Sequence, residues 1–192
     1  MNKKQWLGLG LVTVAAFGLA ACGNRASRSD SSNAKTDLKA AIVTDTGGVD
    51  DKSFNQSAWE GLQAWGKENG LSKDNGFTYY QSNDESQYAN NLNQAATDGY
   101  NLVYGIGFAL RDAVESAAQD NTDINYVIVD DVIEGKENVA SAIFADNEAA
   151  YLAGVAAAKT TKTKQVGFIG GIEGAVITRF EKGFEAGVKS VD

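Results

Sequence analysis

From residue 38 onward, short apolar runs alternate with segments in which apolar residues recur every three or four positions. The runs have strand length and the recurrences have the period of a helix. We expect strands at 38–44, 77–81, 102–105, 124–129, 139–144 and 165–170. We expect helices at 54–69, 89–96, 110–117, 147–159 and 179–189. Strands that alternate with helices predict an α/β fold with a parallel sheet and right-handed crossovers.

The loop between the first predicted strand and the first predicted helix contains the most informative motif in the chain. A glycine pair at 47–48 permits a sharp turn. Ser53 and Gln56 have the spacing of a capping box, which would begin the helix near Phe54. Ligands of open α/β sheets bind at such loops, beyond the carboxyl ends of the strands. A phosphate loop is not favoured, because its lysine motif is missing and the carboxylates of this loop would repel a phosphate.

The residue types in this loop indicate a planar ligand. Phe54 offers a flat apolar ring next to Asn55 and close to Asp45. An aromatic face beside a carboxylate and an amide suits a heterocycle whose edges form hydrogen bonds. The alternative is that Phe54 packs into the core while Asp50 or Asp51 caps the helix. The spacing alone favours neither interpretation.

Two further loops are expected at the same edge of the sheet. Gly105-Ile106-Gly107 follows the third predicted strand, and Asp130-Asp131 follows the fourth. In a parallel sheet both loops lie on the same rim as Asp45. Ionised carboxylates only accept hydrogen bonds, so carboxylates across this rim suit the hydroxyl groups of a ribose. Alternatively, the acidic pair is a solvated loop and the glycines only permit a turn.

The motif Asp-x-Gly-Gly-x-x-Asp-x-Ser-Phe-Asn-Gln at 45–56 resembles that of the basic membrane protein family. These PnrA-like bacterial lipoproteins bind purine nucleosides for ABC transporters. The resemblance extends from residue 38 to the end of the chain. Its weaker motifs are Gly105–Phe108, Val129–Val132, Phe168–Gly171 and Arg179–Gly187.

The resemblance implies a type I periplasmic-binding fold, in which a Rossmann-like lobe and a second lobe close on the ligand. It implies that Phe54 stacks on the purine, that Asp45 and Asn55 contact the base edge, and that Asp130 contacts the ribose. Gly107 is expected to line the site with its backbone. The implied partners are an ABC permease and its ATPase, and neither a cofactor nor a metal is expected.

The same resemblance divides the folded part of the chain. Residues 38–160 would form the N-terminal lobe, and 161–192 would begin a second lobe that this apparently truncated chain does not complete. Phe180, Phe184 and Val188 recur at helical spacing, which is typical of a core stripe. We therefore expect the second aromatic residue of a base sandwich to lie beyond residue 192.

The N-terminus predicts export and lipidation. Two lysines precede an apolar run at 6–21, which is short for a membrane-spanning helix of about 20 residues. Residues 1–21 are therefore expected to be a signal peptide. Leu19-Ala20-Ala21-Cys22 resembles a lipobox, so Cys22 would be lipidated and would become the mature N-terminus on the extracytoplasmic side of the cell membrane. Residues 22–37 are polar and would form a flexible tether.

Composition limits the remaining function classes. The net charge is −8, which argues against nucleic-acid binding. The chain has no histidine, and its single cysteine is the expected lipidation site. No metal-ligand spacing or nucleophile elbow occurs, so we predict that the protein is not an enzyme. The prediction is a lipid-anchored binding protein for purine nucleosides. A sugar-binding protein, a surface adhesin and, less favoured, a nucleoside hydrolase remain open.

Overall fold

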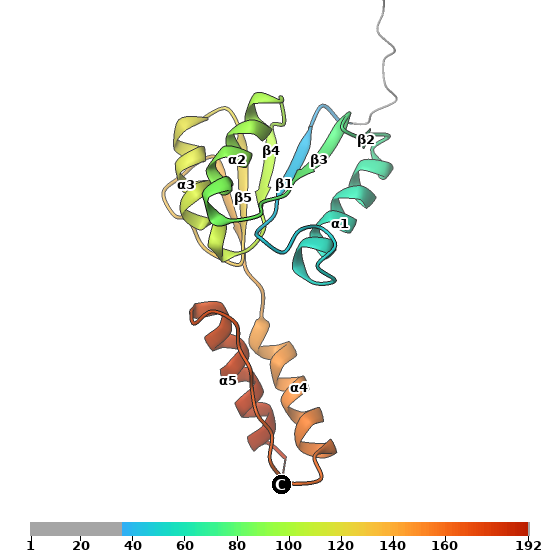
Figure 1. Ribbon diagram of the computed structural model, residues 1–192, viewed down its shortest axis with the longest axis vertical. Coiled ribbons are helices and arrows are strands. Elements are labelled where there is room, and N and C mark those ends of the chain that lie inside the picture. The colour runs from blue at the N-terminus through green and yellow to red at the C-terminus, as the bar shows by residue number, and fades with distance from the viewer. Residues whose placement is uncertain (1–35, 192) are drawn as a thin grey trace, which may run out of the picture. The chain divides into compact units, whose positions relative to one another are not determined.

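The computed structural model describes residues 36–191 and contains one parallel sheet (Figure 1). Its strands are β1 (Ala40–Val43), β2 (Ser72–Lys73), β3 (Gly76–Tyr80), β4 (Leu102–Gly105), β5 (Asn125–Val129) and β6 (Val139–Ala142). They are arranged in the order β2-β3-β1-β4-β5-β6, and all neighbours pair in parallel. The predicted α/β fold with a parallel sheet is confirmed. Among the strands of the described residues, only the two-residue strand β2 was not predicted.

Within 36–191, five α-helices follow the predicted pattern closely. They are α1 (Phe54–Glu68), α2 (Tyr88–Thr97), α3 (Arg111–Asp120), α4 (Asp146–Thr160) and α5 (Ala175–Lys189). Helix α5 begins four residues before the predicted position of 179, directly after Gly174. Short 3-10 turns precede α2 at Glu85–Gln87 and α3 at Phe108–Leu110.

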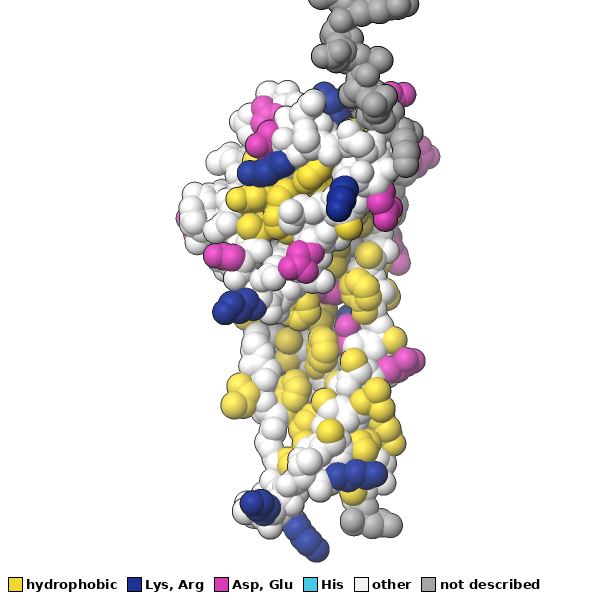
Figure 2. All heavy atoms as spheres, turned by 90° about the vertical axis from the view of Figure 1, so that its right-hand side faces the viewer, with side chains coloured by type: hydrophobic (Ala, Val, Ile, Leu, Met, Phe, Trp, Pro, Cys, Tyr) yellow, Lys and Arg dark blue, Asp and Glu magenta, His cyan; other side chains and the backbone are white. Residues whose placement is uncertain are grey.

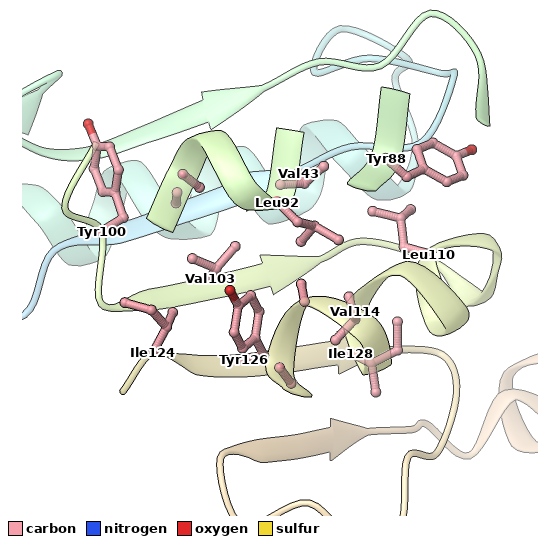
Figure 3. Packing of buried hydrophobic residues seen from close by; sticks show 14 of the residues in the cluster. Val43, Tyr88, Leu92, Tyr100, Val103, Leu110, Val114, Ile124, Tyr126 and Ile128 are labelled. Atoms are coloured by element: carbon pink, nitrogen blue, oxygen red, sulfur yellow. The ribbon is translucent and has the colours of Figure 1, made fainter. Parts of the chain in front are cut away.

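Alternate residues of β1 enter two different cores, one on each face of the sheet. Ala41 and Val43 pack with residues of α2 and α3, whereas Ala40 and Ile42 pack with Leu62 of α1. This alternation follows from the two-residue period of a strand. The first core is shown in Figure 3 and includes Val43, Leu92, Val103, Val114, Tyr126 and Ile128. These side chains fix the carboxyl ends of β1, β4 and β5 relative to one another.

Helices α4 and α5 pack against each other along their whole length (Figure 1). Glycines allow the close approach: a Cβ atom on Gly183 would collide with the backbone of Asn147, and one on Gly187 would collide with the carbonyl group of Tyr151. Residue numbers increase together in these pairs, so the two helices run in the same direction. Figure 2 shows hydrophobic side chains gathered over this helix pair.

The predicted strand at 165–170 is wrong for the part of the chain that the structure describes. This segment is irregular and exposed, and the side chain of Ile169 is 99% accessible. A strand needs a neighbour that accepts and donates backbone hydrogen bonds. Within 36–191 no such neighbour lies beside this segment, so its apolar residues have strand character without strand pairing.

The predicted signal peptide, the lipidation site Cys22 and most of the tether lie outside the described residues. None of the helices within 36–191 is both long enough and apolar enough to cross a membrane.

Candidate ligand-binding site

The predicted convergence of three loops at one edge of the sheet is confirmed. Asp45 follows β1, Gly107 follows β4 and Asp130 follows β5, and these three strands are neighbours. Val43 pairs with Gly105, which pairs with Ile128, so the strand ends are in register. A Cβ atom on Gly107 would lie 3.8 Å from Oδ2 of Asp45. The loops after β1 and β4 therefore meet at this edge.

Asp45 is half-buried and held in one orientation. Its Oδ1 accepts hydrogen bonds from the backbone N–H of Gly47 at 2.8 Å and from Nδ2 of Asn55 at 2.6 Å. Its Oδ2 faces Gly107 and has no hydrogen-bond partner among the described residues. One oxygen is thus used for positioning, and the other remains available to a donor.

Asn55 is buried beneath the loop in the first turn of α1. Its Nδ2 donates to Asp45 and, at 3.0 Å, to Oδ2 of Asp51. Because carboxylates only accept hydrogen bonds, these two partners fix which end of the amide faces them. The amide oxygen is buried and has no hydrogen-bond partner within residues 36–191. The remaining hydrogen-bonding capacity of Asn55 is therefore that of an acceptor.

The cap of α1 is Asp51, and the predicted capping box is wrong. The helix does begin at Phe54, but the side chain of Ser53 makes no capping hydrogen bond, and the side chain of Gln56 donates to Glu60 instead. The carboxylate of Asp51 accepts from the backbone N–H groups of Ser53 at 2.8 Å, Asn55 at 3.1 Å and Gln56 at 3.0 Å. The alternative interpretation, in which an aspartate caps the helix, is confirmed for Asp51.

The hydrogen bonds to Asp51 determine its ionisation. Burial by itself would raise its pKa, but the backbone amides of Gln56, Ser53 and Asn55 stabilise the charged form, and the net pKa is lowered. Asp51 is therefore a structural anion at the start of the helix.

Phe54 lies at the rim of the site. It is the first residue of α1, and 64% of it is exposed. The alternative that Phe54 packs into the core is therefore wrong. An exposed aromatic ring on the same loop as Asp45 and Asn55 presents a flat surface to solvent, which is the geometry that stacking requires.

Asp130 adopts a strained backbone conformation at the end of β5. Its φ angle is +70°, in the left-handed region that few non-glycine residues adopt. Its N–H donates to the carbonyl group of Ala142 at 2.8 Å, which holds this conformation in place. Burial, followed by the negative charge of Asp146, raises the pKa of Asp130, whereas the positive charge of Arg179 opposes the rise. Strain and a partly buried charge are both typical of binding sites.

The sequence interpretation missed two residues near this edge. Tyr88 at the start of α2 is buried, and its phenol pKa is raised by that burial and next by the negative charge of Asp45. Arg179 of α5 donates from Nε to Oδ2 of Asp146 at 2.8 Å. Arg179 belongs to a motif noted in the sequence, but its partner lies 33 residues earlier, where spacing gives no signal.

A cleft of about 370 Å³ adjoins Asp130. Its lining combines loops of the sheet with the start of α5, and includes Phe108, Asp130, Asp131, Ile143, Val176 and Arg179. The cleft is therefore partly apolar and contains charges of both signs.

Comparison with known proteins shows the family to which the chain belongs. Residues 38–192 match the family model described as "ABC transporter substrate-binding protein PnrA-like". The chain is 58% identical over 190 residues to the "ABC transporter nucleoside-binding protein BmpA" of Lactococcus lactis subsp. cremoris, covering 98% of this chain and 54% of that protein. It is 50% identical over 195 residues to the "CD4+ T-cell-stimulating antigen" of Listeria innocua, covering 99% and 55%.

The chain spans about half the length of these curated relatives. Among solved structures, it is similar to an ABC transporter solute-binding protein from Aeropyrum pernix K1, with a TM-score of 0.69 and 24% identity. That match covers 80% of this chain and 43% of the other. At this identity the likeness shows the fold.

Proposed function

The chain belongs to the PnrA-like family of ABC transporter substrate-binding proteins, and we propose that it captures a purine nucleoside and delivers it to an ABC permease. The observation that carries this proposal is that an exposed aromatic residue, Phe54, and two carboxylates, Asp45 and Asp130, all follow strands at the carboxyl edge of one parallel sheet. The name of the Lactococcus relative supports a nucleoside as the ligand.

The base would stack on Phe54 and present its edge to Asp45. The free Oδ2 of Asp45 is an acceptor, whereas the unpaired amide oxygen of Asn55 is buried, so Asn55 would act by holding Asp45 in place. A free carboxylate oxygen suits a base edge that carries N–H donors, as purines do. A hydrogen bond to a charged group contributes about 1.5–3 kcal/mol, and base stacking on an aromatic side chain contributes about 1–3 kcal/mol. Together these contacts would provide most of the affinity for the base.

The ribose would lie toward Asp130, beside the backbone of Gly107. Ribose hydroxyls donate to a carboxylate, so Asp130 would favour nucleosides over free bases. A phosphate group would enter a site that already contains Asp45, Asp130 and Asp131. Like charges in a partly desolvated cleft repel strongly. Nucleotides should therefore bind poorly.

The remaining steps follow from the family. We propose that Cys22 carries the lipid anchor and holds the protein on the extracytoplasmic face of the membrane. Ligand capture would close two lobes about a hinge without any chemical reaction. Replacing Cys22 with alanine should release the protein from the membrane fraction, and finding wild-type protein unmodified and free in solution would contradict the anchor.

The test of the ligand is calorimetry on the protein expressed from its complete gene, without residues 1–21. Adenosine, guanosine and inosine are compared with the free bases, with AMP and with simple sugars. Phe54→Ala should weaken nucleoside binding roughly 5- to 150-fold, which corresponds to the loss of about 1–3 kcal/mol. Phe54→Trp is the matched control, because it keeps an aromatic surface.

Three outcomes would contradict the nucleoside site. They are AMP binding as tightly as adenosine, unchanged binding by Phe54→Ala, and selective binding of a sugar. The last result would assign a sugar-binding function to the same fold. Folding should survive the Phe54 substitutions, since this side chain is exposed.

A further inference from the structure

We propose that Arg179 is a specificity-determining residue of this site, a hydrogen-bond donor that Asp146 orients toward the sugar of the ligand opposite Asp130. The inference rests on the proposed nucleoside function and assigns a role to a residue outside the three loops described above. It concerns how the protein would distinguish a ribonucleoside from a base or a deoxynucleoside.

An ion pair with a buried member fixes the position of the Arg179 guanidinium group. Nε donates to Oδ2 of Asp146 at 2.8 Å, and Nη2 also lies 2.8 Å from this oxygen. Asp146 begins α4, and its side chain is only 6% exposed. Helix α4 packs along α5, where Arg179 lies in the second turn. The guanidinium plane is therefore held by a carboxylate that itself has little freedom to move.

Asp146 does not use all the donors of this side chain. A guanidinium group carries five N–H donors in a planar fork. Nε and Nη2 are both directed at Oδ2 of Asp146, and the side chain as a whole is 34% exposed. Nη1 makes no hydrogen bond within the described residues. A ligand oxygen would satisfy it.

Arg179 and Asp130 line the same cleft. They are also close enough in space for the Arg179 charge to lower the pKa of Asp130 against the effect of its burial. The pair therefore offers one donor and one acceptor to the same volume. A sugar hydroxyl donates one hydrogen bond and accepts others, so a donor and an acceptor together recognise it better than a carboxylate alone.

The charge balance makes a phosphate an unsuitable ligand for this arginine. The lining of the cleft contains three carboxylates, those of Asp130, Asp131 and Glu173, and the guanidinium group of Arg179. The Asp146 carboxylate already compensates Arg179. A neutral, polar group such as a ribose suits this arrangement, because it needs directed hydrogen bonds and adds no charge to be desolvated.

A purely structural role for Arg179 would have different consequences for ligand binding. If Arg179 only clamped α5 to the start of α4, its replacement would lower stability and would weaken all ligands by the same factor. A residue that recognises the sugar must instead change the ratio of affinities between ligands that differ only at the sugar.

The experiment uses the protein expressed from its complete gene, without residues 1–21. Calorimetry compares the tightest-binding ribonucleoside with its 2′-deoxy form and its free base, in wild type, Arg179→Gln and Arg179→Lys. Lys182→Gln is the matched control: it removes a positive charge from the same helix at a side chain that is 63% exposed. Thermal denaturation of each variant reports folding.

We expect Arg179→Gln to weaken binding of the ribonucleoside at least tenfold and binding of the free base less than threefold. The preference for the ribonucleoside over the free base should therefore fall. Arg179→Lys should keep the ion pair and the folded structure but not this preference, because a lysine lacks the planar fork. Arg179→Lys also tests the inference if Arg179→Gln does not fold. Equal losses for all ligands, or an unchanged ratio in Arg179→Lys, would overturn the inference and leave the nucleoside function intact. A wild type that binds no nucleoside would overturn both.

Discussion

The side-chain amide of Asn55 links Asp45 to Asp51, with hydrogen bonds of 2.6 Å and 3.0 Å. One carboxylate caps α1, and the other carries the free oxygen of the candidate site. A single buried amide therefore holds the ligand-facing carboxylate against the start of the helix. Its two N–H groups also screen two negative charges from each other. Positioning of Asp45 thus depends on a side chain that is itself almost inaccessible to solvent.

Replacing Asn55 with aspartate should lower the free energy of unfolding at pH 7. The change removes two donors and adds a third carboxylate to a buried cluster, and the loss of buried hydrogen bonds costs about 1–3 kcal/mol. Urea denaturation measures it. Asn90→Asp is the control, because Asn90 is exposed in the first turn of α2 and its side chain makes no hydrogen bond in the described structure. Equal effects of the two substitutions would contradict the role of Asn55.

Replacing Asp51 with alanine should destabilise the protein by about 0.5–2 kcal/mol, the usual contribution of a helix cap. Hydrogen bonds from backbone amides lower the pKa of Asp51 below its ordinary value of 3.8. The folded state therefore prefers the charged form, and this contribution is fully present above pH 3.8. It is lost as the pH falls through the lowered pKa.

Urea denaturation at pH 7, 5 and 3 tests this dependence on pH. The difference between wild type and Asp51→Ala should be constant from pH 7 to 5 and smaller at pH 3. Asp50→Ala is the matched control, because Asp50 is the exposed neighbour and accepts no hydrogen bond in the described structure. A larger effect of Asp50→Ala would show that Asp50, and not Asp51, caps the helix.

Local patterns in the sequence were sufficient for the strands β1, β3, β4, β5 and β6 and for the edge that carries the site. The apolar run before Asp45 and the runs before Gly107 and Asp130 have the length and composition of buried strands, and parallel order places their ends together. The spacing of residues could not show whether Ser53 or Asp51 caps α1. Both side chains can accept from backbone amides, and only the path of the loop decides which one reaches them.

Pairings between distant segments were not predictable. The segment at 165–170 has the composition of a strand, but strand pairing depends on a neighbour that sequence periodicity does not reveal. The ion pair between Asp146 and Arg179 likewise joins two helices that meet through glycines. Composition also could not show that Phe54 would be exposed, because aromatic residues at helix starts occur both in cores and at rims.

Replacing Asp130 with asparagine should make the protein more stable and a weaker binder. Burial raises the pKa of Asp130, so its ionised form is less favourable in the folded state than in the unfolded one. The effect of this charge on stability is opposite to that of the Asp51 charge. The charge of Asp130 lowers stability at neutral pH, and this cost disappears as the pH falls below the ordinary pKa of 3.8. Asparagine also tolerates the left-handed backbone at this position.

Thermal denaturation at pH 7 should therefore give a higher Tm for Asp130→Asn than for wild type, with the gap closing near pH 3. Nucleoside binding should weaken roughly 10- to 150-fold, as expected when a hydrogen bond to a charge worth about 1.5–3 kcal/mol is lost. Asp131→Asn removes the neighbouring charge and serves as the control, with a smaller effect on both quantities. If Asp130→Asn were less stable and bound normally, Asp130 would be a structural residue.

Replacing Gly187 with alanine should separate α4 from α5. A Cβ atom at this position would collide with the carbonyl group of Tyr151, which is backbone and cannot rotate away. The helices must move apart, and inserting a methyl group into a close-packed interface costs about 1–3 kcal/mol. Gly61→Ala is the control, and it should raise stability instead of lowering it. Gly61 lies in the middle of α1 with open space around it, so alanine should stabilise the helix by about 0.5–1 kcal/mol.

The loss caused by Gly187→Ala should also be local. Helices α4 and α5 pack mainly on each other, whereas β1 and β4 are held by cores that contain neither of them. Opening of one cooperative unit leaves amide protection elsewhere unchanged. Hydrogen exchange should therefore become faster in Asp146–Thr160 and Ala175–Lys189 but not in Ala40–Val43 or Leu102–Gly105. Equal acceleration in the strands would show that the helix pair and the sheet unfold together, and that the glycine contacts support the whole fold rather than one pair of helices.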